Sequence, residues 1–121
     1  MYKVDLYTII DQESYAYQMS FVDKNDTVHE RSFRRESEAS ANQKELYAII
    51  DAIKNIKSRC NLVIHTESNY IVTAINEWLP MWQQNRFINA KGNEVKNKEL
   101  WEEYTLLTLK HQVEVVKERG D

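Results

Sequence analysis

The sequence contains few of the residues that cross-link a chain or interrupt its helices and strands. Among 121 residues there are one cysteine, one proline and two glycines. A single Cys60 excludes an internal disulfide and a cysteine-based zinc site, so we interpret it as a small structural residue. The scarcity of glycine and proline argues against a loop-rich scaffold.

The sequence also lacks long apolar runs and an excess of basic residues. No segment is apolar over the length that a membrane span needs, and the N-terminus has the pattern of a strand rather than of a signal peptide. The net charge of −3 argues against a protein that coats nucleic acid generally, although a local basic patch remains compatible with it. We therefore expect one cytoplasmic domain over residues 1–121 that makes no membrane contact.

What the chain does contain is enough apolar and aromatic surface for a modest core. Hydrophobic residues make up 42% of the sequence, with three Trp, seven Tyr and three Phe. Residues 2–10, 15–21 and 27–33 are rich in strand-forming residues and are separated by short polar turns, which predicts three antiparallel strands. The third segment carries many charges and is expected at a sheet edge, with 34–38 as a charged connection.

Helical spacing begins after this connection. Ser40 and Gln43 have the spacing of a capping box, and apolar residues recur at helical offsets over 39–57. Residues 61–66 predict a buried strand, Ser68 is a candidate helix N-cap, and Pro80 predicts a bend or a separate short helix. A polar loop over 84–96, a helix from Asn97 to about residue 110 and a strand over 113–116 complete the order βββ-α-β-α-(α)-α-β.

Glu67 lies where the buried strand 61–66 ends and the next helix begins. In open α/β sheets, ligands gather at the carboxyl ends of strands. A carboxylate there either binds a metal or substrate, or is a favourable charge at a helix N-terminus. The local pattern leaves both interpretations open.

Several segments in this order resemble ribonuclease H of type 1. Residues 42–46 (Asn-Gln-Lys-Glu-Leu) resemble the family's first helix, and 66–70 (Thr-Glu-Ser-Asn-Tyr) its Thr-Asp-Ser-x-Tyr junction. Residues 76–82 resemble its Trp-rich helix, 95–101 (Val-Lys-Asn-Lys-Glu-Leu-Trp) its Val-Lys-Asn-x-x-Leu-Trp segment, and 112–117 its last strand. The resemblance implies an α/β fold with a mixed five-stranded sheet, three antiparallel strands followed by parallel additions, flanked by helices.

The family cleaves the RNA strand of RNA–DNA hybrids with two magnesium ions held by four carboxylates. The resemblance places Glu45 and Glu67 at two of these positions, as catalytic and metal-binding remnants, and Ile9 at the first Asp position. An apolar side chain offers no oxygen to a hard cation. Asp11 is a possible substitute and Asp121 a more distant one. We expect no cofactor, with Mg²⁺ or Mn²⁺ bound weakly at Glu45 and Glu67 only if activity remains.

The resemblance also implies contacts with nucleic acid. The candidate residues are Ser40, Asn42, Gln43, Asn69, Trp78, Arg86 and Lys91, with Lys96 in the same loop as the last two. The alternatives are core packing for the tryptophans, favoured for Trp82 and Trp101, and a solvated loop for the lysines. The net negative charge predicts weak, salt-sensitive binding to nucleic acid.

The sequence stops at residue 121, about where the family's mobile His loop would begin and before its C-terminal helix. We expect the fold to lack that helix, which would leave apolar sheet surface exposed for a homo-oligomer or a protein partner. Three functions therefore compete. The first is a catalytically degenerate domain that binds RNA–DNA hybrid or duplex, the second a protein–protein interaction module, and the third a residual magnesium- or manganese-dependent hybrid ribonuclease.

Overall fold

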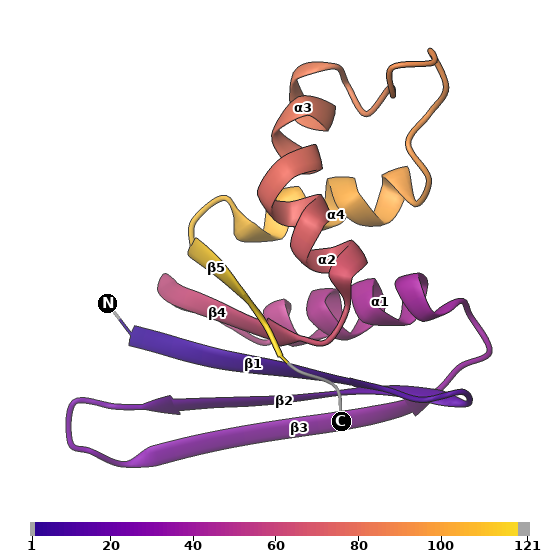
Figure 1. Cartoon of the computed structure of the whole chain (residues 1–121). Coiled ribbons are helices and arrows are strands. Elements are labelled where there is room, and N and C mark those ends of the chain that lie inside the picture. The colour runs from indigo at the N-terminus through magenta and orange to yellow at the C-terminus, as the bar shows by residue number, and fades with distance from the viewer. Residues whose placement is uncertain (1, 119–121) are drawn as a thin grey trace.

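The computed structural model describes residues 2–118 and has the predicted order of elements. Five strands form one sheet in the order β3-β2-β1-β4-β5, with β1, β2 and β3 antiparallel and with β4 and β5 parallel to β1 (Figure 1). The elements are β1 Tyr2–Ile10, β2 Ser14–Val22, β3 Val28–Glu36, α1 Ala41–Ile53, β4 Cys60–Thr66, α2 Asn69–Thr73, the π-helical turn η1 Ala74–Trp78, α3 Leu79–Gln84, α4 Lys98–Thr108 and β5 Gln112–Lys117.

The third strand is longer than its sequence predicts. Residues 34–36 were expected in a connection, but they pair with the start of β2, where Tyr15 lies opposite Arg35 and Ser14 opposite Glu36. Because β2 offers hydrogen-bonding partners over its whole length, pairing overrides the low strand propensity of these charged residues. Every residue of β3 is exposed, which agrees with the predicted edge position.

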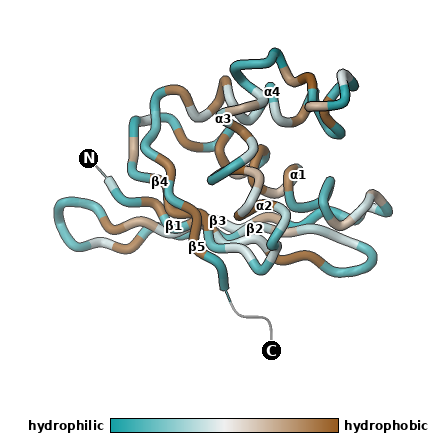
Figure 2. The backbone as a smooth tube through the Cα atoms, turned by 45° about the horizontal axis from the view of Figure 1, so that its top comes forward, coloured by the Kyte–Doolittle hydropathy of each residue, from teal (hydrophilic) through white to brown (hydrophobic). Residues whose placement is uncertain are grey.

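The helices cover one face of the sheet and enclose the core. Figure 2 shows apolar backbone segments gathered where sheet and helices meet, whereas the β2–β3 turn and the outer loops are hydrophilic. Leu6 of β1, Ile64 of β4 and Ile49 of α1 are fully buried between the layers. Trp101 and Tyr104 bring α4 onto the same core. The predicted core role of Trp101 is confirmed.

Helix α1 begins with the predicted capping box. The Ser40 hydroxyl accepts from the Gln43 amide at 3.2 Å, and the Gln43 side-chain oxygen accepts from the Ser40 amide at 3.4 Å. The pair satisfies two amides that the first turn of a helix leaves without partners. The helix ends at Ile53, four residues earlier than predicted, because Lys54 to Ile56 turn away in hydrogen-bonded turns.

Two further helix starts differ from each other. Ser68 caps α2 as predicted, accepting from the Ile71 amide at 3.2 Å. Asn97 does not cap α4 with its side chain. Its backbone is left-handed, with φ of 64°, and its side-chain oxygen accepts from the Gln43 side chain at 3.3 Å. Asn97 therefore ties α4 to the first turn of α1.

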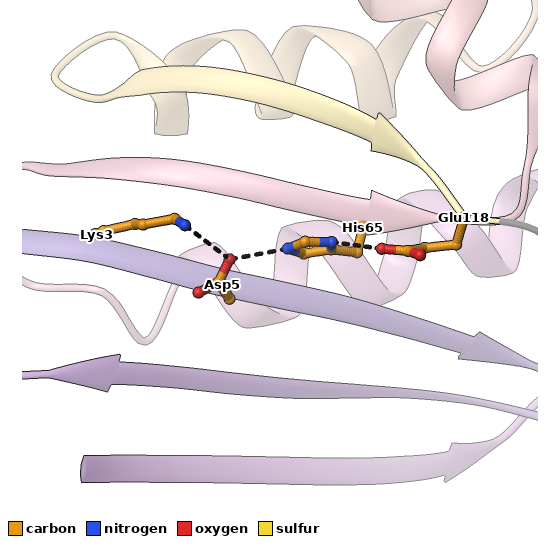
Figure 3. Close-up of polar contacts among 4 residues, drawn as sticks. All are labelled: Lys3, Asp5, His65 and Glu118. Atoms are coloured by element: carbon orange, nitrogen blue, oxygen red, sulfur yellow. Dashed lines mark hydrogen bonds and ion pairs between the residues drawn. The ribbon is translucent and has the colours of Figure 1, made fainter.

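The opposite face of the sheet has no helix over it among the described residues and carries a polar chain (Figure 3). His65 lies between two carboxylates, with Nε2 2.8 Å from Asp5 and Nδ1 2.6 Å from Glu118. Tyr7 stacks on the imidazole at 4.2 Å. These contacts join β1, β4 and the residue after β5. Within residues 2–118, no helix is long and apolar enough to cross a membrane.

Candidate functional site

The candidate site lies at the sheet edge where β1, β4 and β5 end and where α1 and α2 begin (Figure 1). Strands β1 and β4 run parallel, with Tyr7 aligned to His65. Ile9 stands two residues further along β1, and Glu67 follows two residues after His65, just past the end of β4 at Thr66. Ile9 is 54% exposed and presents only hydrocarbon at the position where the resemblance expects an aspartate.

Glu45 reaches this edge from α1 and is almost completely buried. The Thr66 hydroxyl donates to its carboxylate at 3.1 Å and in turn accepts from the Ser68 amide at 3.0 Å. Burial raises the pKa of the Glu45 carboxyl, and the charge of Glu67 raises it further. The carboxylate is thus held by β4 rather than pointed into solvent.

Lys117 is a member of this site that the sequence did not reveal. Its ammonium, at the end of β5, donates to the main-chain carbonyl of Glu67. Its positive charge lowers the pKa of Glu45 and so partly opposes the effect of burial. A basic side chain therefore lies beside the two carboxylate positions. Only the pairing of β5 with β4, which aligns Lys117 with Thr66, brings it there.

Asp11 is turned toward its own loop. Strand β1 ends at Ile10, and the Asp11 carboxylate accepts from the Glu13 amide at 2.9 Å and from the Ser14 hydroxyl at 2.8 Å. These hydrogen bonds, the Ser14 bond foremost, lower the pKa of Asp11. The local shift that would let Asp11 replace Ile9 must break both bonds. Asp121 lies outside the described residues.

Lys44, also missed from the sequence, fixes the same turn from α1. The residue is 3% exposed, and its ammonium donates to the main-chain carbonyls of Asp11 at 2.8 Å and Gln12 at 2.7 Å. A buried lysine on the core side of an amphipathic helix was the available signal, because such a charge needs partners.

The described side chains fit a magnesium site poorly. Magnesium requires oxygen ligands in near-octahedral geometry. Ile9 supplies none, Glu45 is buried against Thr66, and Asp11 is committed to its turn. Over residues 2–118, no three His, Cys, Asp or Glu side chains gather in a way that could hold a metal ion.

The predicted nucleic-acid contacts divide into committed and free groups. The side chains of Ser40 and Gln43 already form the hydrogen bonds of the capping box, and that of Gln43 also donates to Asn97. Asn42 and Asn69 lie exposed in the first turns of α1 and α2, at the same edge of the sheet (Figure 1). Their amides can both donate and accept, as sugar and base edges require.

Trp78 stands at the outer end of an aromatic cluster. It is 36% exposed, with its ring 6.2 Å from Tyr70 and 5.8 Å from Trp82. Trp82 is partly buried against Trp101, whose indole nitrogen donates to the Tyr70 hydroxyl at 3.0 Å. The inner rings support the outer one, so Trp78 offers a preorganised aromatic surface to solvent.

Arg86, Lys91 and Lys96 lie exposed in the loop between α3 and α4, which projects beyond the helical layer (Figure 1). The loop is anchored by Phe87 and Val95, both buried, whose main chains are joined by a 2.9 Å hydrogen bond. It is therefore a structured protrusion with three basic side chains.

The architecture defines the class of protein: a mixed five-stranded α/β domain whose candidate site lies at the ends of β1 and β4. A family model for RNase H matches residues 11–120. Ribonuclease H from Francisella tularensis subsp. novicida is 40% identical over 86 residues, covering 71% of this chain and 57% of the relative. The same protein from Francisella philomiragia is 41% identical over 78 residues. This chain thus belongs to the RNase H family, and it spans little more than half the length of these curated relatives.

Solved structures support the same fold. LC9-RNase H1, described as a type 1 RNase H with the type 2 active-site motif, matches with a TM-score of 0.79 at 21% identity, covering 99% of this chain and 64% of that one. A foamy viral protease–reverse transcriptase in complex with an RNA/DNA hybrid matches with a TM-score of 0.65 at 22% identity, covering 96% of this chain and 17% of that one. The predicted fold class is confirmed.

Proposed function

We propose that this chain is an RNase H-family module that binds RNA–DNA hybrid or nucleic-acid duplex without efficient cleavage. The observation that carries the proposal is a contrast between exposed groups on α1, α2 and η1 and the carboxylate positions beside them. Asn42, Asn69 and Trp78 remain exposed, whereas the carboxylate set is interrupted by Ile9 and neighboured by Lys117. Side chains that could contact nucleic acid are exposed, whereas the carboxylates that would bind magnesium are not brought together.

The structural neighbours support the choice of ligand. Foamy viral protease–reverse transcriptase, which has this fold, is described in complexes with RNA/DNA hybrid and with double-stranded DNA. In the present chain, amides at the helix N-termini would contact sugar and minor-groove edges, Trp78 would pack on a sugar or base, and Arg86 and Lys91 would meet phosphates. The net charge of −3 limits affinity and makes it sensitive to salt.

Fluorescence anisotropy with labelled hybrid, double-stranded and single-stranded probes at low salt tests the proposal. We expect hybrid or duplex to bind with a Kd on the order of tens of micromolar at low salt. The affinity should fall steeply as the salt concentration is raised. Asn69→Ala and Trp78→Ala should each weaken binding about tenfold, because each removes a contact worth roughly 1–2 kcal/mol. Asn25→Ala, in the distant β2–β3 turn, is the matched control. Absence of binding at these concentrations would refute the proposal.

The residual-nuclease alternative is tested by incubating labelled hybrid with Mg²⁺ or Mn²⁺. We expect no cleavage beyond that of a protein-free control, because the described donor set does not assemble a metal site. Cleavage that disappears in Glu45→Gln would establish the nuclease instead.

A protein–protein interaction module remains a second candidate for one specific reason. Tyr7 and Ile9 are 40% and 54% exposed, and they share the face of β1 on which Tyr7 stacks against His65. Exposed apolar side chains of this size favour an interface, with a second copy or another protein. Sedimentation analysis of wild type and Ile9→Asp distinguishes the two: a dimer that the variant dissociates would support this candidate.

A further inference from the structure

A hollow of about 650 Å³ lies at the end of the sheet remote from Glu45 and Glu67. It opens on the helix-covered face, between the β2–β3 hairpin and the segment from Asn55 to Ser58 that follows α1. The hairpin extends past the end of α1, so no helix of the described residues 2–118 covers this part of the sheet (Figure 1). The volume is in the range of pockets that take small molecules.

The floor of the hollow is made from the core itself. Val4, Met19 and Cys60 contribute to its lining and are themselves 5%, 6% and 1% exposed. Ile56, packed against the core, closes one side. Side chains this well packed cannot collapse into the space, so the hollow is preformed and apolar at its base.

One wall of the hollow is aromatic and held in place. Phe21 stacks on His29 with ring centroids 4.7 Å apart and planes 10° apart, and Tyr2 meets Phe21 edge-on at 5.7 Å. Asp23 fixes the histidine through a 2.8 Å contact to Nε2. A flat ligand would therefore meet a rigid ring surface, which limits the entropy cost of binding.

The rim is cationic. Arg31 lies opposite Met19 in the β2–β3 ladder and so shares the face of the hollow, while Lys57 faces it from the loop after α1. Within residues 2–118 neither side chain forms an ion pair. Glu30, the acidic residue of the lining, alternates with Arg31 along β3, so its carboxylate belongs to the other face.

We propose that this hollow is a binding site for a small aromatic monoanion. Its rings would lie on the apolar floor and against the Phe21–His29 wall, and its anionic group would lie between Arg31 and Lys57. The hollow is separate from Asn42, Asn69 and Trp78, and the proposal does not depend on the nucleic-acid binding proposed for those residues.

The test uses anilinonaphthalene sulfonate as the probe and the uncharged N-phenylnaphthylamine as its neutral counterpart, both followed by fluorescence. The double variant Arg31→Gln with Lys57→Gln removes the rim charges. Arg34→Gln with Lys54→Gln is the matched control, because it removes one charge from the same strand and one from the end of α1 but touches no lining residue. Far-UV circular dichroism checks that both variants are folded.

We expect one sulfonate probe per chain, with Kd raised about fivefold to tenfold in the rim variant and unchanged in the control. The neutral probe should bind both variants like wild type. Amide shifts of wild type on adding the sulfonate should centre on Met19, Phe21 and Ile56. Equal affinity in the rim variant and wild type, equal losses in both variants, or shifts centred elsewhere would each overturn the proposal.

Discussion

Replacing Lys44 with methionine isolates the energy of one buried ammonium. Lys44 is 3% exposed, and its Nζ donates to the Asp11 and Gln12 carbonyls at 2.8 and 2.7 Å. Methionine keeps most of the aliphatic stem and its packing, but it removes both hydrogen bonds. The variant therefore measures how firmly α1 holds the β1–β2 turn beside the candidate site.

The magnitude follows from the geometry. Each hydrogen bond to a charged group contributes roughly 1.5–3 kcal/mol. Asp11 and Gln12 are exposed, so water recovers part of the loss at their carbonyls. We expect the free energy of unfolding of Lys44→Met to fall by about 2–4 kcal/mol, which lowers Tm by roughly 8–16 °C for a chain of this size.

Urea unfolding followed by far-UV circular dichroism measures this change. Lys110→Met is the matched control, because Lys110 also donates to a main-chain carbonyl, that of Lys57 at 3.3 Å, but lies exposed. We expect the control to lose less than about 0.5 kcal/mol. Equal losses in the two variants would refute the reasoning that burial makes the Lys44 contacts strong.

Two further predictions concern buried acids. Burial raises the pKa of Glu45 in the folded state, so wild-type stability falls as pH rises through that value. Glu45→Gln should be more stable than wild type by about 1 kcal/mol at pH 7 and should lose this advantage in acid, where the carboxyl of the wild type is protonated. Urea unfolding at several pH values measures the difference in stability. A difference that stays constant across pH would contradict the prediction. Tyr15 donates to Asp51 at 2.7 Å, and burial with this bond raises its pKa to about 12. Tyr15→Phe should cost about 1–2 kcal/mol and remove one step, that near pH 12, from the ultraviolet tyrosine titration.

Local patterns were sufficient for the elements and the order of the fold. The capping box at Ser40, the N-cap at Ser68 and the interruption at Pro80 each depend on neighbours within a few residues, and each is found where the sequence places it. The length of β3 was underestimated because its last residues are stabilised by pairing with β2 rather than by their own propensity.

The members of the candidate site that escaped prediction are those set by distant pairing. Lys117 meets Glu67 only through the β4–β5 register, and Lys44 meets the β1–β2 turn only through the packing of α1 on the sheet. His65 and Asp5 are 60 positions apart, and they meet because β1 and β4 are parallel neighbours. No local window of sequence carries these contacts.

The central place of β1 has a consequence for how the chain folds. Its antiparallel contacts with β2 need only a short turn, whereas its parallel contacts with β4, which align Tyr2 with Cys60, require a long loop to close. The hairpins can therefore form early, leaving one edge of β1 unpaired until the second half of the chain arrives. During that interval the free edge carries Lys3 and Asp5, and charged side chains of this kind discourage pairing with another molecule.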